Sequence, residues 1–247
     1  MRLSQAWIIA RHDMGIIRKK QGIMAGLIAL PLGVGIGFPL LVWYIVGQGG
    51  GTGGLESYLP YLVNAFSFWW VIGAAMLPIA IAAYGIVGEK IEKSLEPLLS
   101  TPSTDGEILL GKVLAAFLPT IVAIWAGSAV YQVLIDVTTR GPLGYLLFPS
   151  WGMAVILFAL APLSCLYAIE FSVIVSSRAT DARSAQQYGG IIFIPMIFIY
   201  VAGEIGFIPL DTTNLLYISA GMTVLVLALF YASERIFHRE EILTRWK

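Results

Sequence analysis

The sequence has little charge and almost none of the residues that form disulfides or metal sites. Only 12% of its 247 residues are charged, whereas soluble domains carry roughly a quarter. Cys165 is the single cysteine, which excludes an intrachain disulfide. The two histidines, His12 and His238, have no cysteine or histidine at metal-ligand spacing around them. These shortages exclude an ordinary soluble domain and leave no metal-binding motif.

Long apolar runs fill the rest of the chain, 58% of which is hydrophobic. Six stretches lack any charged residue: 21–55, 57–88, 113–135, 141–169, 184–203 and 212–233. Each is about as long as the roughly 20 residues that an α-helix needs to cross a bilayer. The runs do not alternate as the strands of a membrane barrel do. We therefore predict an all-α polytopic membrane protein with six transmembrane helices, forming one transmembrane domain over residues 1–247.

The positive charges predict the orientation of these helices. Of the 15 lysines and arginines, 14 lie before the first span, in 88–112, in 177–187 or after the last span. The three loops of the other side hold only Arg140. Because lysine and arginine concentrate in cytoplasmic loops, both termini and segment 88–112 are predicted to be cytoplasmic.

Residues 1–20 are polar and basic, which does not fit a cleavable leader. They predict an amphipathic helix lying in the membrane interface. Its expected apolar stripe is Leu3, Trp7, Ala10, Met14 and Ile17, with Arg11 and Arg18 on the opposite side. The candidate interface residues are Trp7, Arg11, Met14 and Arg18. An ordinary cytosolic helix packed on another subunit is the alternative.

Segment 88–112 is a charged island that holds eight of the thirty charged residues. Its first part is amphipathic, because Ile91, Leu95 and Leu98 recur at helical spacing between charged residues. A turn at Thr101-Pro102 follows. The run from Thr104 to Glu107 has the spacing of a capping box just before an apolar stretch, and it predicts the start of the third span, over about 108–135.

The same island contains an apparent phosphate-binding motif. Residues 106–112 match G-x-x-x-x-G-K, but Val113 stands where a serine or threonine would ligate magnesium. No strand is predicted before the motif, and bulky Ile and Leu fill it. We therefore predict no nucleotide site on this chain, with Lys112 extending towards the membrane surface from the start of a span.

A few residues inside the predicted spans invite a functional interpretation. Glu170 is the only carboxylate clearly within a span, where an ionisable group is costly unless it is paired, protonated or wet. A structural pair with a cytoplasmic arginine or lysine is one explanation, and a role in transport or gating is the other. The adjacent Trp69 and Trp70 are candidates for a partner surface or a wet pathway, or for simple core packing.

Two further segments carry weaker signals. Gly22-xxx-Gly26 is a candidate packing face in the first span. The fifth span, about 188–203, is barely long enough to cross. The half-apolar segment 203–212 that follows it is a candidate outer re-entrant piece.

Segment 88–112 resembles the cytoplasmic loop of type-2 ATP-binding-cassette (ABC) exporter permeases. That family pattern has a glutamate-rich helix end, Gly-Thr-Leu-Glu, two leucines, Thr-Pro, and Glu-Ile ahead of Gly-Lys. Here Ser94-Leu95-Glu96 replaces Gly-Thr-Leu-Glu, whereas the residues from Leu98 to Lys112 fit. The polar loop at 176–190 is similar to the family segment before the fifth span.

The resemblance implies a transmembrane subunit that works with partners. Two copies, or this chain and a sister chain, form the pathway, and separate ATPase subunits that hold ATP and magnesium dock on the cytoplasmic side. Segment 1–20 is then the connecting helix and 88–107 the coupling loop. The implied coupling residues are Glu89, Ile91, Leu95, Glu96, Leu98, Leu99, Thr101, Pro102 and Glu107. The family implies a prokaryotic plasma membrane, lipid contact and no nucleic-acid partner.

Two other classes remain as alternatives. A membrane-embedded enzyme needs clustered ionisable residues at membrane depth, and only Glu170 and Cys165 qualify, five residues apart and without a base. No catalytic residue is therefore assigned. A secondary carrier or channel is favoured by inverted repeats and several buried charges, and the sequence has neither. No group of residues selects a substrate.

Overall fold

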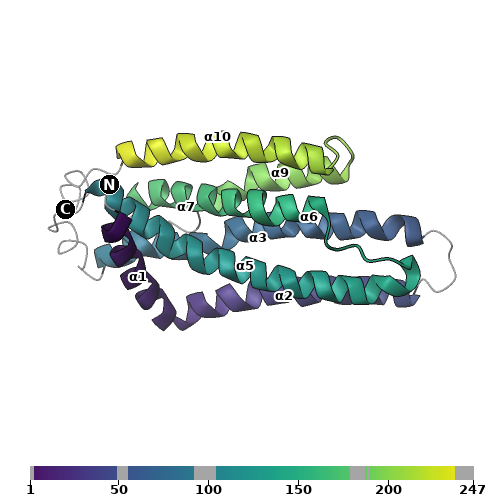
Figure 1. Cartoon of the computed structure of the whole chain (residues 1–247). Coiled ribbons are helices and arrows are strands. Elements are labelled where there is room, and N and C mark those ends of the chain that lie inside the picture. The colour runs from purple at the N-terminus through teal and green to yellow at the C-terminus, as the bar shows by residue number, and fades with distance from the viewer. Residues whose placement is uncertain (1–2, 49–54, 92–103, 179–186, 188–189, 237–247) are drawn as a thin grey trace.

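The computed structural model describes residues 3–48, 55–91, 104–178, 187 and 190–236, and every regular element in these residues is a helix (Figure 1). The elements are α1 (Leu3–Lys19), α2 (Gln21–Gln48), α3 (Leu55–Ile91), α5 (Asp105–Leu143), α6 (Trp151–Val155), the π-helix η1 (Ile156–Leu160), α7 (Ala161–Arg178), the 3-10 turn η2 (Gly190–Ile192), α9 (Phe193–Glu204) and α10 (Thr212–Ile236). The predicted all-α class is confirmed for this part of the chain.

Five of these helices are long and apolar enough to cross a membrane. Their apolar ranges are Gln21–Gln48, Ser57–Ala82, Gly106–Leu143, Trp151–Val175 and Thr212–Ser233. The predicted fifth span corresponds to the shorter apolar helix Gly190–Glu204. At 1.5 Å per residue it extends only about 22 Å, less than the ~30 Å of the hydrocarbon core. A sixth crossing therefore stays a prediction.

Helix α3 occupies the middle of the bundle. In Figure 1, α3, α5, α7 and α10 run roughly along one direction, while α1 folds across one end of the bundle. The apolar window of α3 is 78% buried, against 28% for α2 and 22% for α10. Helix α3 is therefore the core of the bundle, and α2 and α10 leave most of their apolar surface uncovered.

Helices α2 and α5 cross at very short distance near the middle of α2. A Cβ added to Gly35 would lie 2.7 Å from the carbonyl oxygen of Gly127, and one added to Gly127 would lie 2.6 Å from the Pro31 Cβ. Only glycine fits on both sides of this crossing, as is common where membrane helices approach closely. The predicted Gly22/Gly26 face is wrong within the chain, because a Cβ at either position meets no atom within 4 Å.

The fourth span contains a π-helical turn with a chemical cause. In η1 the Ala161 N–H donates to the Ile156 carbonyl. The next carbonyl, that of Leu157, would be the acceptor for residue 162, but Pro162 has no N–H. The Trp125 indole of α5 donates to this carbonyl instead, at 3.0 Å. A neighbouring helix thus satisfies the backbone group that the proline leaves without a donor, as membrane helices require.

Helix α5 is longer at its C-terminal end than the predicted span. The sequence predicts a span that ends near Ile135, whereas the helix itself continues to Leu143. It ends at Gly144, whose φ of 72° is the left-handed conformation that favours glycine. Asp136 lies within the helix, and its Oδ1 accepts hydrogen bonds from the Leu147 and Phe148 N–H groups at 2.9 and 3.1 Å. The carboxylate therefore holds the chain that leaves α5.

The segment between α9 and α10 forms a compact turn. The Phe207 and Ile208 N–H groups both donate to the Ala202 carbonyl, and Gly206 has a φ of 76°. The Leu210 side chain lies over Gly203, so closely that a Cβ there would be 2.6 Å from it. Whether 203–212 enters the membrane stays a prediction.

Candidate coupling and pathway sites

Helix α5 begins with the predicted capping box. The Glu107 N–H donates to the Thr104 Oγ1 at 3.3 Å, and the Thr104 N–H donates to the Glu107 Oε2 at 3.0 Å. Glu107 is only 4% exposed. The reciprocal bonds satisfy two backbone donors at the helix start and fix the direction in which the chain enters α5. This prediction is confirmed.

Most other candidate coupling residues fall elsewhere in the chain. Glu89 and Ile91 belong to the end of α3, where side chains lie outside the described part. The remaining candidates, Leu95, Glu96, Leu98, Leu99, Thr101 and Pro102, lie outside the described residues altogether. Their role in coupling stays a prediction.

Helix α1 packs tightly on the first turns of α5. A Cβ added to Gly111 would lie 2.8 Å from the Ile9 Cβ and 2.9 Å from the Ala6 carbonyl oxygen. Ala6 and Ala10 are completely buried. Gly111, which occupies the last glycine position of the apparent phosphate-binding motif, therefore has a packing role: it lets the backbone of α1 approach α5.

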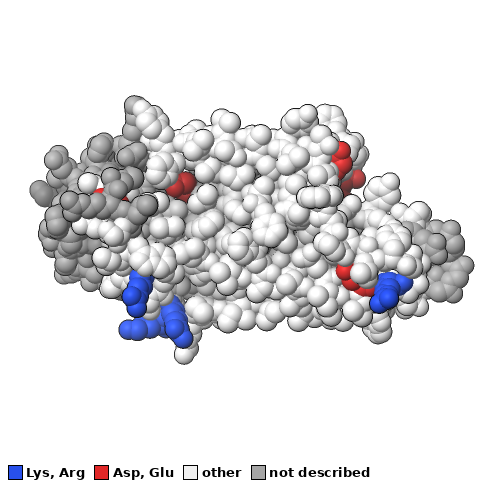
Figure 2. Space-filling model, in the orientation of Figure 1, with Lys and Arg blue, Asp and Glu red and all other residues white. Residues whose placement is uncertain are grey.

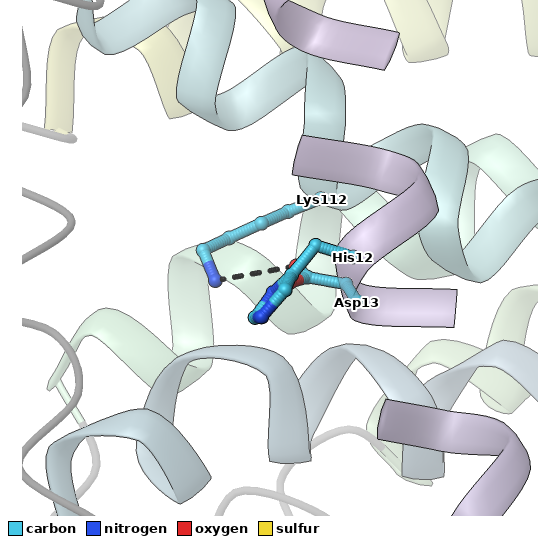
Figure 3. A network of polar contacts seen from close by, with 3 residues as sticks. All are labelled: His12, Asp13 and Lys112. Atoms are coloured by element: carbon cyan, nitrogen blue, oxygen red, sulfur yellow. Dashed lines mark hydrogen bonds and ion pairs between the residues drawn. The ribbon is translucent and has the colours of Figure 1, made fainter. Parts of the chain in front are cut away.

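A buried ion pair joins the same two helices (Figure 3). The Lys112 Nζ lies 3.7 Å from the Asp13 Oδ2, and the two side chains are 4% and 12% exposed. The His12 Nδ1 also lies 3.3 Å from the Asp13 Oδ1. The prediction that Lys112 extends to the membrane surface is wrong, because the lysine points towards α1 and its charge is compensated there. Asp13 could not be recognised as the partner of Lys112 from the sequence, because nothing local connects residues so far apart along the chain.

The orientation of α1 differs from the predicted one. Residues 3–19 do form a helix, and Ala10 and Ile17 are buried as predicted, with Met14 partly buried. Trp7, however, is half exposed. The buried face is turned towards Ala6, because the small alanines fit over Gly111 and a tryptophan does not. Arg11 and Arg18 are exposed as predicted.

The two adjacent tryptophans of α3 have different surroundings. Trp70 is 1% exposed and packs edge-on against Tyr131 of α5, with ring centroids 5.9 Å apart. Trp69 is 38% exposed and lies between Phe38 of α2 and Tyr200 of α9, with centroids 5.9 and 6.0 Å away. Trp70 is therefore a core residue, whereas Trp69 belongs to a partly open aromatic surface along α3.

Glu170 lies in the packed interface between α7 and α10. It is 1% exposed, and the Ser233 hydroxyl of α10 donates to its Oε2 at 2.6 Å. The partner that the structure gives is therefore a hydroxyl, where the sequence suggested a lysine or arginine. This contact joins α10 to α7 near the end of the bundle that contains the start of α5 (Figure 1).

The described residues include no group of three or more His, Cys, Asp or Glu placed to hold a metal ion. A family model described as "ABC-2 family transporter protein" matches residues 7–231. No curated protein matches the sequence. The matched range contains every helix described above except the first residues of α1 and the last of α10.

Proposed function

The chain belongs to the ABC-2 transporter family, and from this premise we propose that it is the transmembrane permease subunit of an ABC exporter in a prokaryotic plasma membrane. Separate ATPase subunits, docked on the end where α5 starts, hold ATP and magnesium and drive the conformational change. The chain itself holds no nucleotide: Gly111 and Lys112, the last two residues of the apparent phosphate-binding motif, are engaged by α1.

The observation that carries this proposal is the anchored start of α5. Segment 88–107 leads from α3 directly into the capping box, and within two turns Gly111 and Lys112 fasten α5 to α1. If a partner moves this segment, the movement is therefore passed to α3 at one end of the segment and to the packed α1–α5 pair at the other end. Binding energy from ATP-driven closure of the partner can thus be converted into movement of two spans relative to each other.

A second permease chain, identical or a sister, completes the pathway in this proposal. The apolar faces of α2 and α10 are mostly uncovered. On α3, Trp69 and Met76 are 38% and 51% exposed, so one side of this helix is partly open. We assign the aromatic surface at Trp69, Phe38 and Tyr200 to the pathway side. Trp70 and Glu170 are assigned to packing within the subunit.

The docking part of the proposal is tested with charge substitutions on the apolar ridge of 88–107. Leu95→Asp and Leu98→Asp place a carboxylate where an apolar side chain would enter a groove of the ATPase. We expect co-purification with the cognate ATPase subunit to fall at least about tenfold, which corresponds to about 1.4 kcal/mol. Leu146→Asp, an exposed leucine between α5 and α6, is the matched control and should leave co-purification intact.

The nucleotide part is tested on the purified chain alone. We expect no ATP turnover without the partner and turnover in the complex. Undiminished co-purification of both ridge variants would contradict the docking site, and robust turnover by the isolated chain would contradict the division of labour. A carrier that needs no ATPase would transport in vesicles that contain this chain alone.

A further inference from the structure

One face of α1 stays exposed when the opposite face packs on α5. At 100° per residue, the packed residues Ala6, Ala10 and Asp13 cluster on one side of the helix. The opposite side lines an open, shallow groove of about 500 Å³, and all its lining residues belong to α1: Trp7, Ile8, Arg11, His12, Gly15, Ile16 and Lys19. Trp7 and Ile8 are 50% and 66% exposed, so the groove presents large apolar side chains beside basic ones.

The charge on this face is all of one sign. Asp13 is the only acidic residue among residues 1–20, and it faces Lys112 at 3.7 Å on the packed side. The ion pair thus removes the one negative charge from the exposed face, which keeps Arg11 and Lys19. Figure 2 shows basic side chains gathered at this end of the molecule, near the junction of α1 and α2.

The exposed face of α1 lies close to the start of the first membrane-spanning helix, α2. Helix α1 ends at Lys19, and the spanning helix α2 begins at Gln21. The basic groove therefore lies next to the point where the chain enters the hydrocarbon, at the level of the lipid headgroups. Basic residues with tryptophan and isoleucine on one helix face are the combination that binds anionic lipid surfaces.

We propose that the groove of α1 at Trp7, Arg11, Gly15 and Lys19 binds the phosphate headgroup of an anionic phospholipid. Arg11 and Lys19 bind the phosphate, and Trp7, Ile8 and Ile16 contact the upper part of the acyl chains. The inference goes beyond the proposed function: the sequence predicts that α1 lies in the membrane interface, and the proposal adds the lipid class and the face that binds it. Because α1 is fastened to α5 through Gly111 and Lys112, a lipid bound here contacts the same rigid unit that the coupling segment enters.

The test uses the full chain in vesicles without any ATPase, so its failure is separate from failure of the exporter proposal. Vesicles contain the same fraction of either brominated phosphatidylglycerol or brominated phosphatidylcholine, which quench nearby tryptophans. The chain has seven tryptophans, so the signal of Trp7 is isolated by subtracting the Trp7→Phe variant. We expect brominated phosphatidylglycerol to quench Trp7 more strongly than the zwitterionic lipid.

Charge variants make the test specific. Each cation contributes about fivefold to the affinity for an anionic surface, so Arg11→Gln/Lys19→Gln should lower the preference for phosphatidylglycerol about 25-fold. The charge-retaining swap Arg11→Lys/Lys19→Arg should keep the preference, and so should Arg140→Gln at the far end of α5. Because Arg11 and Lys19 are exposed, the neutral variant should elute as folded protein.

Three results would overturn the proposal. The first is equal quenching of Trp7 by the two brominated lipids, and the second is an unchanged preference in Arg11→Gln/Lys19→Gln. The third is removal of the phosphatidylglycerol signal when the ATPase subunit is added, because the face would then be a protein-docking surface.

Discussion

The ion pair between Asp13 and Lys112 holds α1 on α5, and its removal gives the sharpest test of that junction. The side chains are 12% and 4% exposed with 3.7 Å between the charged atoms. Removing one member of such a pair leaves a buried charge and costs about 3–5 kcal/mol. Lys112 makes a further interaction, so we expect the lower end, about 3 kcal/mol, for Asp13→Asn. At 1.4 kcal/mol per factor of ten, the undocked form of α1 becomes roughly a hundredfold more populated.

Thiol labelling measures this population. Ala10 is completely buried on the packed face of α1, so Ala10→Cys reacts with a maleimide only when α1 leaves α5. With Cys165 replaced by alanine, the labelling rate should rise about a hundredfold in Asp13→Asn. The double variant Asp13→Leu/Lys112→Met removes both charges and should label nearly as slowly as the parent. A rate in Asp13→Asn within a few-fold of the parent would refute the reasoning.

Two further predictions concern the helix contacts of the bundle. Gly35→Ala should lower the free energy of unfolding by about 1–3 kcal/mol, because the added methyl group overlaps Gly127. Gly33→Ala has open space around it and should be neutral or stabilising by up to about 1 kcal/mol. Thermal unfolding in detergent compares the two variants, and equal midpoints would argue against the crossing. Ser233→Ala should lower the free energy of unfolding by about 1–3 kcal/mol, because Glu170 loses its hydrogen-bond donor. Glu170→Gln keeps an acceptor for Ser233 and should fold normally. A transport defect in Glu170→Gln at unchanged stability would instead assign the residue to gating.

Local chemistry was predictable where a short run of residues determines it. The capping box needs only Thr104 and Glu107 at the correct spacing, and both bonds form. The apolar stretches predict all five helices that are long enough to cross, because length and hydropathy decide which segments can do so. Their ends are less accurate: the stretch 141–169 corresponds to Trp151–Val175, for example. The helix α5 continues eight residues past the predicted end of its span at Ile135, because an uncharged stretch predicts where a span ends and Gly144 determines where the helix ends.

Contacts between distant segments were not predictable from one sequence. Gly22 and Gly26 have the spacing of a packing face, but spacing does not say which helix arrives, and the crossing forms at Gly35 and Gly127. Lys112 resembles any lysine at a membrane boundary until α1 brings Asp13 beside it. Adjacent Trp69 and Trp70 point in different directions on one helix, so their different burial follows only from the arrangement of α2, α5 and α9.

The bond from Trp125 to the Leu157 carbonyl has a consequence for movement. Separating α5 from the fourth span at this level would leave both a carbonyl and an indole N–H without a partner, and hydrocarbon offers no water as a substitute. Pro162 thus makes the fourth span depend on its neighbour for a bond that an unbroken helix forms by itself. A rearrangement that is driven from the start of α5 and keeps this bond turns about this point, so that the two helices stay together there and change their spacing towards their ends.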